Sequence, residues 1–197
     1  AAPGGKTTHM AQKMENLGEI YAMDLSKGKL DFVEEMSHRL GIKIVKTIKG
    51  DAGRPLPIPP AMKFDRILAD VPCSGFGTLR KNPDLKWRRG REDIKRLSGL
   101  QLSILRNLGE YVKEGGVLIY STCTVFREEN EEVVEIFLDE SPVFQFESID
   151  KILPEKCHPF FYNRYFKTFP PADEMDGFFA ARLIKSSGDQ SRRGKDG

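Results

Sequence analysis

Three apolar segments that each end in an aspartate place the strongest limit on the folds open to this chain. The segments cover residues 19–24, 42–51 and 64–70, and their acidic ends are Asp24, Asp51 and Asp70. Short apolar segments of this kind predict strands, and the helical pattern after Asp24 favours a parallel α/β sheet. Parallel strands end at one edge, where open α/β sheets bind ligands. The three carboxylates are therefore predicted to share one pocket, where they accept hydrogen bonds from a ribose and an amino-bearing base.

The rest of the chain alternates between predicted helices and strands. Ser26 is placed to cap a helix whose apolar side chains recur at helical spacing up to Leu40. A longer helix is predicted over residues 91–113, and Gly115 and Gly116 are expected to end it. The later elements are expected to be a strand over residues 117–124, a helix over 127–138, a strand over 144–149, an aromatic loop over 158–171 and a last strand over 176–185.

Composition sets limits on domain number and location. Hydrophobic residues make up 39% and charged residues 30% of the 197 residues, as in ordinary globular proteins. We expect one α/β domain over residues 1–185 and a polar, basic, disordered tail over 186–197. No apolar run approaches the ~20 residues that a membrane span needs, so no membrane partner is expected. Three cysteines are too few for a disulfide framework, which favours a reducing, cytoplasmic location. No metal site is predicted.

The first eight residues, Ala-Ala-Pro-Gly-Gly-Lys-Thr-Thr, predict a glycine-rich turn that leads into a helix. Gly4 and Gly5 would let a ligand approach the backbone closely, and Thr7 or Thr8 would cap the helix. Asp24 follows Gly4 by 20 positions, the spacing at which Rossmann-type folds place a carboxylate on ribose hydroxyls. The Gly-Lys-Thr triplet also fits the end of a phosphate-binding loop, so a nucleotide triphosphatase is an alternative.

Residues 64–84 form the centre of the predicted site. Pro72 ends the strand because it lacks the N–H group that a ladder needs. The loop that follows holds Cys73 among small residues, which let a flat ligand approach its backbone. A second cysteine, Cys123, lies at the end of the strand predicted over residues 117–124. A lone buried cysteine is more often a small apolar side chain than a nucleophile. Here, however, both thiols lie at strand ends, as Asp70 does.

A basic segment over residues 80–96 predicts a polyanionic partner. It holds eight basic and three acidic residues, which give it a net charge of +5. Such a local excess suits nucleic acid, although a solvated helix face is the ordinary role of a charge run. Aromatic side chains in the loop over residues 158–171 are candidates for stacking on bases, or else for a packed surface loop. These are Phe160, Phe161, Tyr162, Tyr165 and Phe166.

Four motifs in this order resemble the RsmB/Sun/Nop family of RNA (cytosine-5)-methyltransferases. They are AAPGGKT at residues 1–7, DVPCSG at 70–75, YSTC at 120–123 with Glu129 and Asn130, and DGFF at 176–179. The resemblance covers residues 1–185, and two cysteine motifs at separate strand ends make it highly specific. The segment over residues 82–87 is most similar to the bacterial RsmB branch, which modifies small-subunit ribosomal RNA.

The resemblance implies a class I S-adenosylmethionine-dependent methyltransferase fold, an α/β fold with a mostly parallel, seven-stranded sheet and one antiparallel strand near its end. It implies that Cys123 is the nucleophile, that Cys73 helps to release the product, and that Asp70 lies beside both the cofactor and the target base. Asp24 would hold the ribose of S-adenosylmethionine and Asp51 would lie by its adenine. The residues expected to wrap its methionine part are Ala1, Ala2, Pro3, Gly4, Gly5 and Lys6.

The sequence departs from the family pattern at its start. The family has a central strand and an Asp-x-Cys motif before AAPGGKT, and neither is present here, so we expect a fragment of a longer polypeptide. An RNA-binding module without catalytic activity is therefore an alternative to the enzyme. RNA is the expected partner, and no obligate protein partner is predicted.

Overall fold

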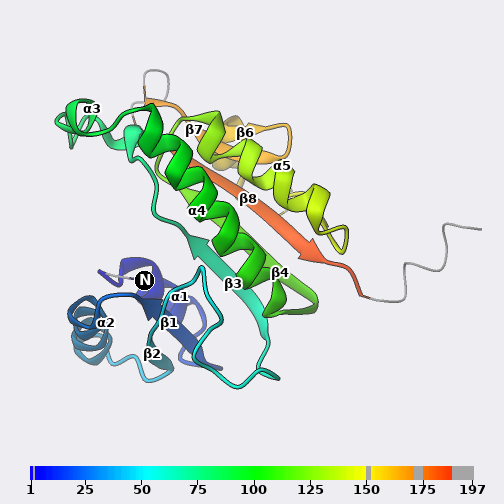
Figure 1. Ribbon diagram of the computed structural model, residues 1–197. Coiled ribbons are helices and arrows are strands. Elements are labelled where there is room, and N and C mark those ends of the chain that lie inside the picture. The colour runs from blue at the N-terminus through cyan, green and yellow to red at the C-terminus, as the bar shows by residue number, and fades with distance from the viewer. Residues whose placement is uncertain (2, 150–151, 171–174, 188–197) are drawn as a thin grey trace, which may run out of the picture. The chain divides into compact units, whose positions relative to one another are not determined.

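The computed structural model describes residues 1, 3–149, 152–170 and 175–187 (Figure 1). The chain divides into two units, Ala1–Pro60 and Ala61–Gly197. The second half of the predicted tail, residues 188–197, lies outside the described residues. The prediction of a single catalytic domain over residues 1–185 stays a prediction.

The first unit packs two helices against a parallel pair of strands. Its elements are α1 (Gly5–Lys13), β1 (Ile20–Asp24), α2 (Lys27–Arg39) and β2 (Val45–Lys49). The register of β1 and β2 pairs Ile20 with Val45 and Asp24 with Lys49, so both strands end at the same edge. The core between helices and strands is formed by side chains that are at most 8% exposed: Ala11, Ala22, Leu30, Val33 and Ile42.

One of the two predicted helix caps is confirmed. The side-chain oxygen of Ser26 accepts a hydrogen bond from the backbone N–H of Lys29, 3.4 Å away, at the start of α2. The expected cap of α1 by Thr7 or Thr8 is wrong. The helix begins at Gly5, and the Thr8 hydroxyl donates to the Gly4 carbonyl oxygen inside the first turn. Both threonines are buried there, because the chain turns into the helix earlier than their capping preference indicates.

The second unit is built on a six-stranded sheet. Its strands are β3 (Phe64–Asp70), β4 (Val112–Thr122), β5 (Phe144–Phe146), β6 (Phe161–Tyr162), β7 (Tyr165–Thr168) and β8 (Phe178–Lys185). The strand order is β3-β4-β8-β7-β6, and β5 also pairs with β8. β3 and β4 are parallel, whereas β8 runs antiparallel to β4. A parallel pair followed by an antiparallel strand agrees with the predicted fold class.

The longer helices of this unit lie side by side along the sheet (Figure 1). The helices are α3 (Leu85–Arg88), α4 (Arg91–Glu110) and α5 (Glu131–Glu140), with short 3-10 turns at Phe76–Thr78, Arg127–Glu129 and Glu155–Phe160. The core is made by fully buried side chains that include Leu105, Leu118, Val134, Phe137 and Leu183. No helix in the described part of the chain is long and apolar enough to cross a membrane.

The predicted boundary between the long helix and the next strand is wrong. α4 ends at Glu110, and β4 begins at Val112, which pairs with Phe64 of β3. Gly115 has a φ of 71°, and the register of the two strands shifts between Phe64 and Arg66. The glycines therefore mark an irregularity inside a strand and do not end a helix.

Three later predictions also need correction. The helix expected from residue 127 begins at Glu131, and the strand expected over 144–149 ends at Phe146. The aromatic loop contains a hairpin of β6 and β7. Tyr165 in this hairpin is only 9% exposed and packs against Phe146 and Phe179, so it is not available to stack on bases.

Candidate active site

The two cysteines of the predicted site lie side by side. Asp70 of β3 pairs with Ser121 of β4, so the loops that follow the two parallel strands leave the sheet at the same edge. This brings the sulfur atoms of Cys73 and Cys123 to 3.3 Å from each other. Both side chains are half-buried and both are free thiols. Two thiols that lie 50 residues apart in the sequence therefore form one close pair.

The environment keeps Cys73 in its thiol form. The hydrogen bond with Cys123 and burial both raise the pKa of the Cys73 thiol far above its ordinary value. The backbone N–H of Cys123 donates to the Cys73 sulfur at 3.3 Å and acts in the opposite direction on this pKa, but the two raising effects are larger. A protonated Cys73 can donate its S–H to the neighbouring sulfur. This arrangement is suited to hold negative charge on Cys123.

Asp70 is the third predicted catalytic residue and ends β3 next to this pair. Its Oδ1 accepts a hydrogen bond from the Ser121 hydroxyl at 3.0 Å, and Asp70 is exposed to solvent. Only two residues separate Asp70 from Cys73. The carboxylate and the two thiols are therefore on the same edge of the same sheet, as the sequence predicts.

A buried carboxylate that the sequence did not single out for a role connects the two cysteine loops. Glu129 is completely buried. Its Oε1 accepts hydrogen bonds from the Ser74 backbone N–H at 2.8 Å and from Gln101 Nε2 at 2.9 Å, and its Oε2 accepts from the Ser74 hydroxyl. Gln101 Nε2 also donates to the Pro72 carbonyl oxygen at 2.9 Å. The residues on both sides of Cys73 are thus held by α4 and by the turn before α5.

Asn130 holds the loop of Cys123 in the same way. Its Oδ1 accepts from the Thr122 hydroxyl at 2.6 Å, and its Nδ2 donates to the Thr124 carbonyl oxygen at 3.0 Å. Thr124 in turn shares a hydrogen bond of 2.8 Å with the Ser74 hydroxyl. The motif of Glu129 and Asn130 was visible in the sequence, but its action through Ser74 was not, because that depends on side chains far apart in the chain.

Gly77 brings a third loop to the site. Its N–H donates to the Cys123 carbonyl oxygen at 2.9 Å, and its own carbonyl accepts from the Gly177 N–H at 2.7 Å. A Cβ atom at Gly77 would lie 2.1 Å from the Gly177 oxygen, so no larger residue fits. Lys81 forms an ion pair with Asp176, the first residue of the DGFF motif. Three of the four motifs are therefore packed together in the second unit.

The first unit holds the other predicted residues at the carboxyl edge of β1 and β2. The backbone nitrogen of Ala1 donates to the Met23 carbonyl oxygen at 3.0 Å and lies 3.3 Å from Asp24 Oδ2. Gly4 has a φ of 109°, a conformation that favours glycine, and it caps α1. Pro3, Gly5 and Lys6 complete this turn, and Ala2 lies outside the described residues.

The carboxylates of this unit are oriented by the backbone. Asp24 Oδ1 accepts from the Ser26 N–H at 3.0 Å, and Asp51 Oδ1 accepts from the Gly53 N–H at 2.9 Å. Asp51 also lies 3.5 Å from the Arg54 guanidinium. Asp24 is the last residue of β1 and Asp51 follows the end of β2 by two residues, so both acids lie at the carboxyl ends of neighbouring parallel strands, as predicted. That they share one pocket with Asp70 of the second unit stays a prediction.

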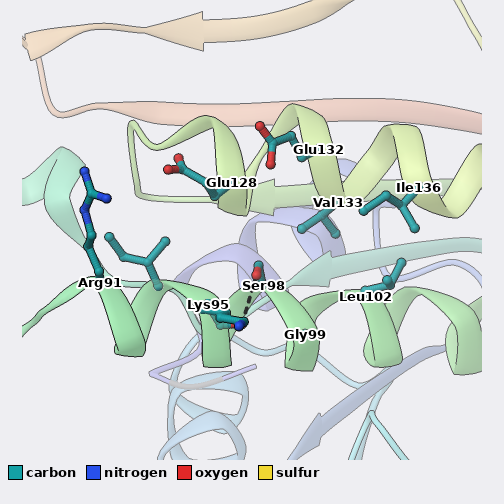
Figure 2. Close-up of a pocket in the computed structure, with 10 residues that line it drawn as sticks. Arg91, Lys95, Ser98, Gly99, Leu102, Glu128, Glu132, Val133 and Ile136 are labelled. Atoms are coloured by element: carbon teal, nitrogen blue, oxygen red, sulfur yellow. Dashed lines mark hydrogen bonds between the residues drawn. The ribbon is translucent and has the colours of Figure 1, made fainter.

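A separate groove lies between α4 and α5 in the second unit (Figure 2). Its volume is about 510 Å³, and its apolar lining includes Ile94, Leu102, Val133 and Ile136. Arg91 and Lys95 lie along the α4 side, and Glu128 and Glu132 lie across from them. None of the lining residues belongs to the two cysteine loops, so the groove is separate from the pair of thiols.

Comparison with known proteins shows close relatives. The family model of 16S rRNA methyltransferase RsmB/F matches residues 1–184. The probable ribosomal RNA small subunit methyltransferase B of Bacillus subtilis (strain 168) is 43% identical over 186 residues, which are 94% of this chain and 42% of that protein. The crystal structure of PH0851 is similar with a TM-score of 0.84 and 39% identity, over 94% of this chain and 41% of that one. NSun6 from Pyrococcus horikoshii, solved with SFG, has a TM-score of 0.81 and 36% identity, over 95% and 46% of the two chains.

The chain spans about two fifths of the length of the curated relative described above. The structural likenesses confirm the class I methyltransferase fold. The family model runs through all four motifs, and this accounts for the Gly-Lys-Thr triplet without a phosphate-binding loop. The chain belongs to the RsmB/F family of 16S rRNA methyltransferases.

Proposed function

We propose that the protein methylates carbon 5 of a cytosine in RNA, in particular small-subunit ribosomal RNA, through a covalent bond between Cys123 and the cytosine ring. The observation that carries this proposal is the pair of thiols, 3.3 Å apart at the ends of two adjacent parallel strands. The relatives named as small-subunit ribosomal RNA methyltransferases support the choice of RNA.

Carbon 5 of cytosine is too weak a nucleophile to take a methyl group unaided. Attack of the Cys123 thiolate on carbon 6 forms a carbon–sulfur bond and makes carbon 5 electron-rich, which is covalent catalysis. S-adenosylmethionine, when bound, supplies the electrophilic methyl group. A base then removes the proton from carbon 5, and the bond between carbon 6 and the Cys123 sulfur breaks to release the methylated base.

Residues of the first unit fit the cofactor. The carboxylates of Asp24 and Asp51 are acceptors for ribose hydroxyls and for the adenine amino group. These acids lie in the same unit as the glycine-rich turn of Gly4. The start of α1, which follows this turn, would bind the carboxylate of the methionine part of the cofactor. The solved structure of the relative with SFG, an S-adenosylmethionine analogue, supports this choice of cofactor.

Asp70 and Cys73 take the supporting roles. A carboxyl group at Asp70 would share or donate a proton at ring nitrogen 3 as negative charge develops there. Cys73, whose pKa is raised by its bond to Cys123 and by burial, would donate its S–H to the thiolate before attack and assist release afterwards. The free thiols also suit a reducing compartment such as the cytoplasm.

The basic segment over residues 80–96 would bind phosphates. A cytosine inside a duplex cannot reach the thiols, so the target is single-stranded or flipped out of its stack. An RNA-binding module without catalysis would use the same surface. Mass spectrometry of RNA incubated with the protein and S-adenosylmethionine separates the two, because only the enzyme yields 5-methylcytosine.

The roles of the two cysteines predict opposite trapping behaviour. Cys123→Ala removes the nucleophile, so it should abolish both methylation and any covalent protein–RNA adduct. Cys73→Ala removes the group that assists release, so it should accumulate an adduct that survives denaturing electrophoresis. Cys157→Ala, at the third free cysteine, is the matched control and should change neither. An adduct trapped by Cys123→Ala and absent from Cys73→Ala would reverse the assignment.

A further inference from the structure

An exposed tryptophan in the basic segment is not explained by the chemistry of the cysteines. Trp87 is 83% exposed, more than any other large apolar side chain in the described part of the chain. It is also the only tryptophan in the sequence. Tryptophan is usually well buried, because its ring removes a large apolar area from water. An indole left in solvent on an ordered element indicates a binding surface.

The indole is held on a fixed support near the cysteines. The backbone N–H of Trp87 donates to the Asp84 carbonyl oxygen at 3.0 Å, within the single turn of α3. Leu85 of the same turn packs against the loop of the first thiol, since a Cβ at Gly75 would lie 3.2 Å from Leu85 Cδ1. Gly75 follows Cys73 by two positions. In Figure 1, α3 projects outward from the start of α4.

The side chains next to the indole are cations. Lys86 Nζ lies 5.0 Å from the centre of the Trp87 ring. Within the residues that the structure describes, Lys86 and Arg91 pair with no carboxylate. Arg88 and Arg89, in contrast, form ion pairs with nearby aspartates of the same segment. A net charge of +5 over residues 80–96 disfavours an apolar protein partner and favours a polyanion with flat apolar groups.

We propose that Trp87 stacks on an unpaired base of the RNA substrate while Lys86 and Arg91 contact the flanking phosphates. This inference rests on RNA being the substrate. Single-stranded nucleic acids are commonly bound by aromatic side chains that stack on bases beside cations that follow the backbone. The support by Leu85 would place this base at a fixed distance from the one that reaches the cysteines. Trp87 is therefore a positioning residue for the target.

Fluorescence of the indole provides a direct test. The signal of Trp87 is the difference between the full protein and its Trp87→Phe variant. A short single-stranded oligoribonucleotide should quench this signal, because stacking brings a base against the ring, and inorganic polyphosphate should not. Equal quenching by polyphosphate, or none by RNA, would overturn the inference. The inference would also be overturned if acrylamide did not quench the Trp87 signal in the free protein, because another part of the protein would then cover the indole.

Affinity measurements separate stacking from charge. Trp87→Ala should weaken binding of the oligoribonucleotide about 5- to 150-fold, with an unchanged dependence on salt. Trp87→Tyr should keep most of the affinity. Replacing both Lys86 and Arg91 with glutamine should weaken binding and also lower the salt slope, because fewer counterions are released. Ile136→Ala, at an exposed apolar residue on α5, is the matched control and should bind normally.

The two proposals fail in different ways. If Trp87→Ala binds RNA as the unchanged protein does, while the unchanged protein makes 5-methylcytosine, the stacking inference is wrong and the proposed function stands. If RNA quenches the indole but no cytosine is methylated, the stacking inference stands and the proposed reaction is wrong.

Discussion

At the scale of single residues, Glu129 tests how the cysteine loops are held. Glu129→Ala removes the acceptor of the Ser74 N–H and one of the two acceptors of Gln101 Nε2. Each buried donor left without an acceptor costs about 1–3 kcal/mol. We expect the free energy of unfolding to fall by about 2–6 kcal/mol in urea denaturation. Glu129→Gln keeps an acceptor oxygen for both donors, so most of the stability should remain.

A second readout distinguishes positioning from stability alone. In a Cys73→Ala background, Glu129→Gln should still form the covalent adduct, whereas Glu129→Ala should form it more slowly even where the protein is fully folded. Equal unfolding free energies for the two Glu129 variants would show that the buried bonds do not hold the loops.

The sequence predicted the positions of the candidate catalytic residues but not their hydrogen-bond partners. Cys73, Cys123 and Asp70 were predicted at strand ends, and the structure places them on one edge of one sheet. The 3.3 Å between the thiols depends on the register of β3 and β4, which no local pattern encodes. Gln101 lies among the buried side chains of α4. Helical spacing alone predicts that this position is buried, but it does not predict the hydrogen bond of Gln101 to the Glu129 carboxylate.

At the scale of secondary-structure elements, the hairpin of β6 and β7 gives a pH prediction. Burial, reinforced by the carboxylates of Glu135 and Glu131, raises the pKa of Tyr165 to about 12. The folded state therefore holds this proton more tightly than the unfolded state, whose tyrosine pKa is about 10. The resulting stability is complete below about pH 10 and is lost as the pH rises through about 12.

Substitution isolates this contribution. Between about pH 10 and pH 12 the unfolding free energy should fall less steeply in Tyr165→Phe, by at most about 1.4 kcal/mol per pH unit for one proton. Tyr162→Phe is the matched control, since Tyr162 lies in the same hairpin and is 51% exposed. Urea unfolding at a series of alkaline pH values measures the slopes. The same slope in Tyr165→Phe and the unchanged protein would contradict the assignment.

Element boundaries were predicted less well than element types. The first strand and the helix capped by Ser26 follow their sequence patterns closely, whereas the second strand is shorter than the segment that predicted it. The end of α4 at Glu110 was predicted too late in the chain. Pairing of Val112 with β3 outweighs the helical preference of the residues before Gly115. The hairpin with Tyr165 was read as a loop, since its strands are too short to show alternation.

At the scale of the whole molecule, the cofactor residues of the first unit can be tested together. Replacing both Asp24 and Asp51 with alanine removes the acceptors expected for ribose and adenine. Hydrogen bonds to charged groups contribute about 1.5–3 kcal/mol each, so S-adenosylhomocysteine should bind at least about 100-fold more weakly. Titration calorimetry on the full protein measures this. Asp31→Ala, an exposed acid on α2, is the matched control, and normal affinity in the double variant would exclude this site.

The fold class could be predicted because spaced motifs and strand ends are local features. The four motifs also identify the family, which the matches over 94% of the chain confirm. A pocket shared by the three aspartates was predicted from the parallel arrangement alone. The structure puts Asp24 and Asp51 in one unit and Asp70 in the other, so the shared pocket stays a prediction.

The contact between Gly77 and Gly177 has a consequence for genetic screens. Because the two backbones touch, the loop after Cys73 and the DGFF turn interlock without side chains. Even a methyl group at Gly77 would push the loops apart and would also disturb its bond to the Cys123 carbonyl. A survey of all single substitutions for loss of growth or activity would therefore rank this glycine beside the cysteines, although it carries no functional group. Intolerance to mutation at this position reports on close packing and not on chemistry.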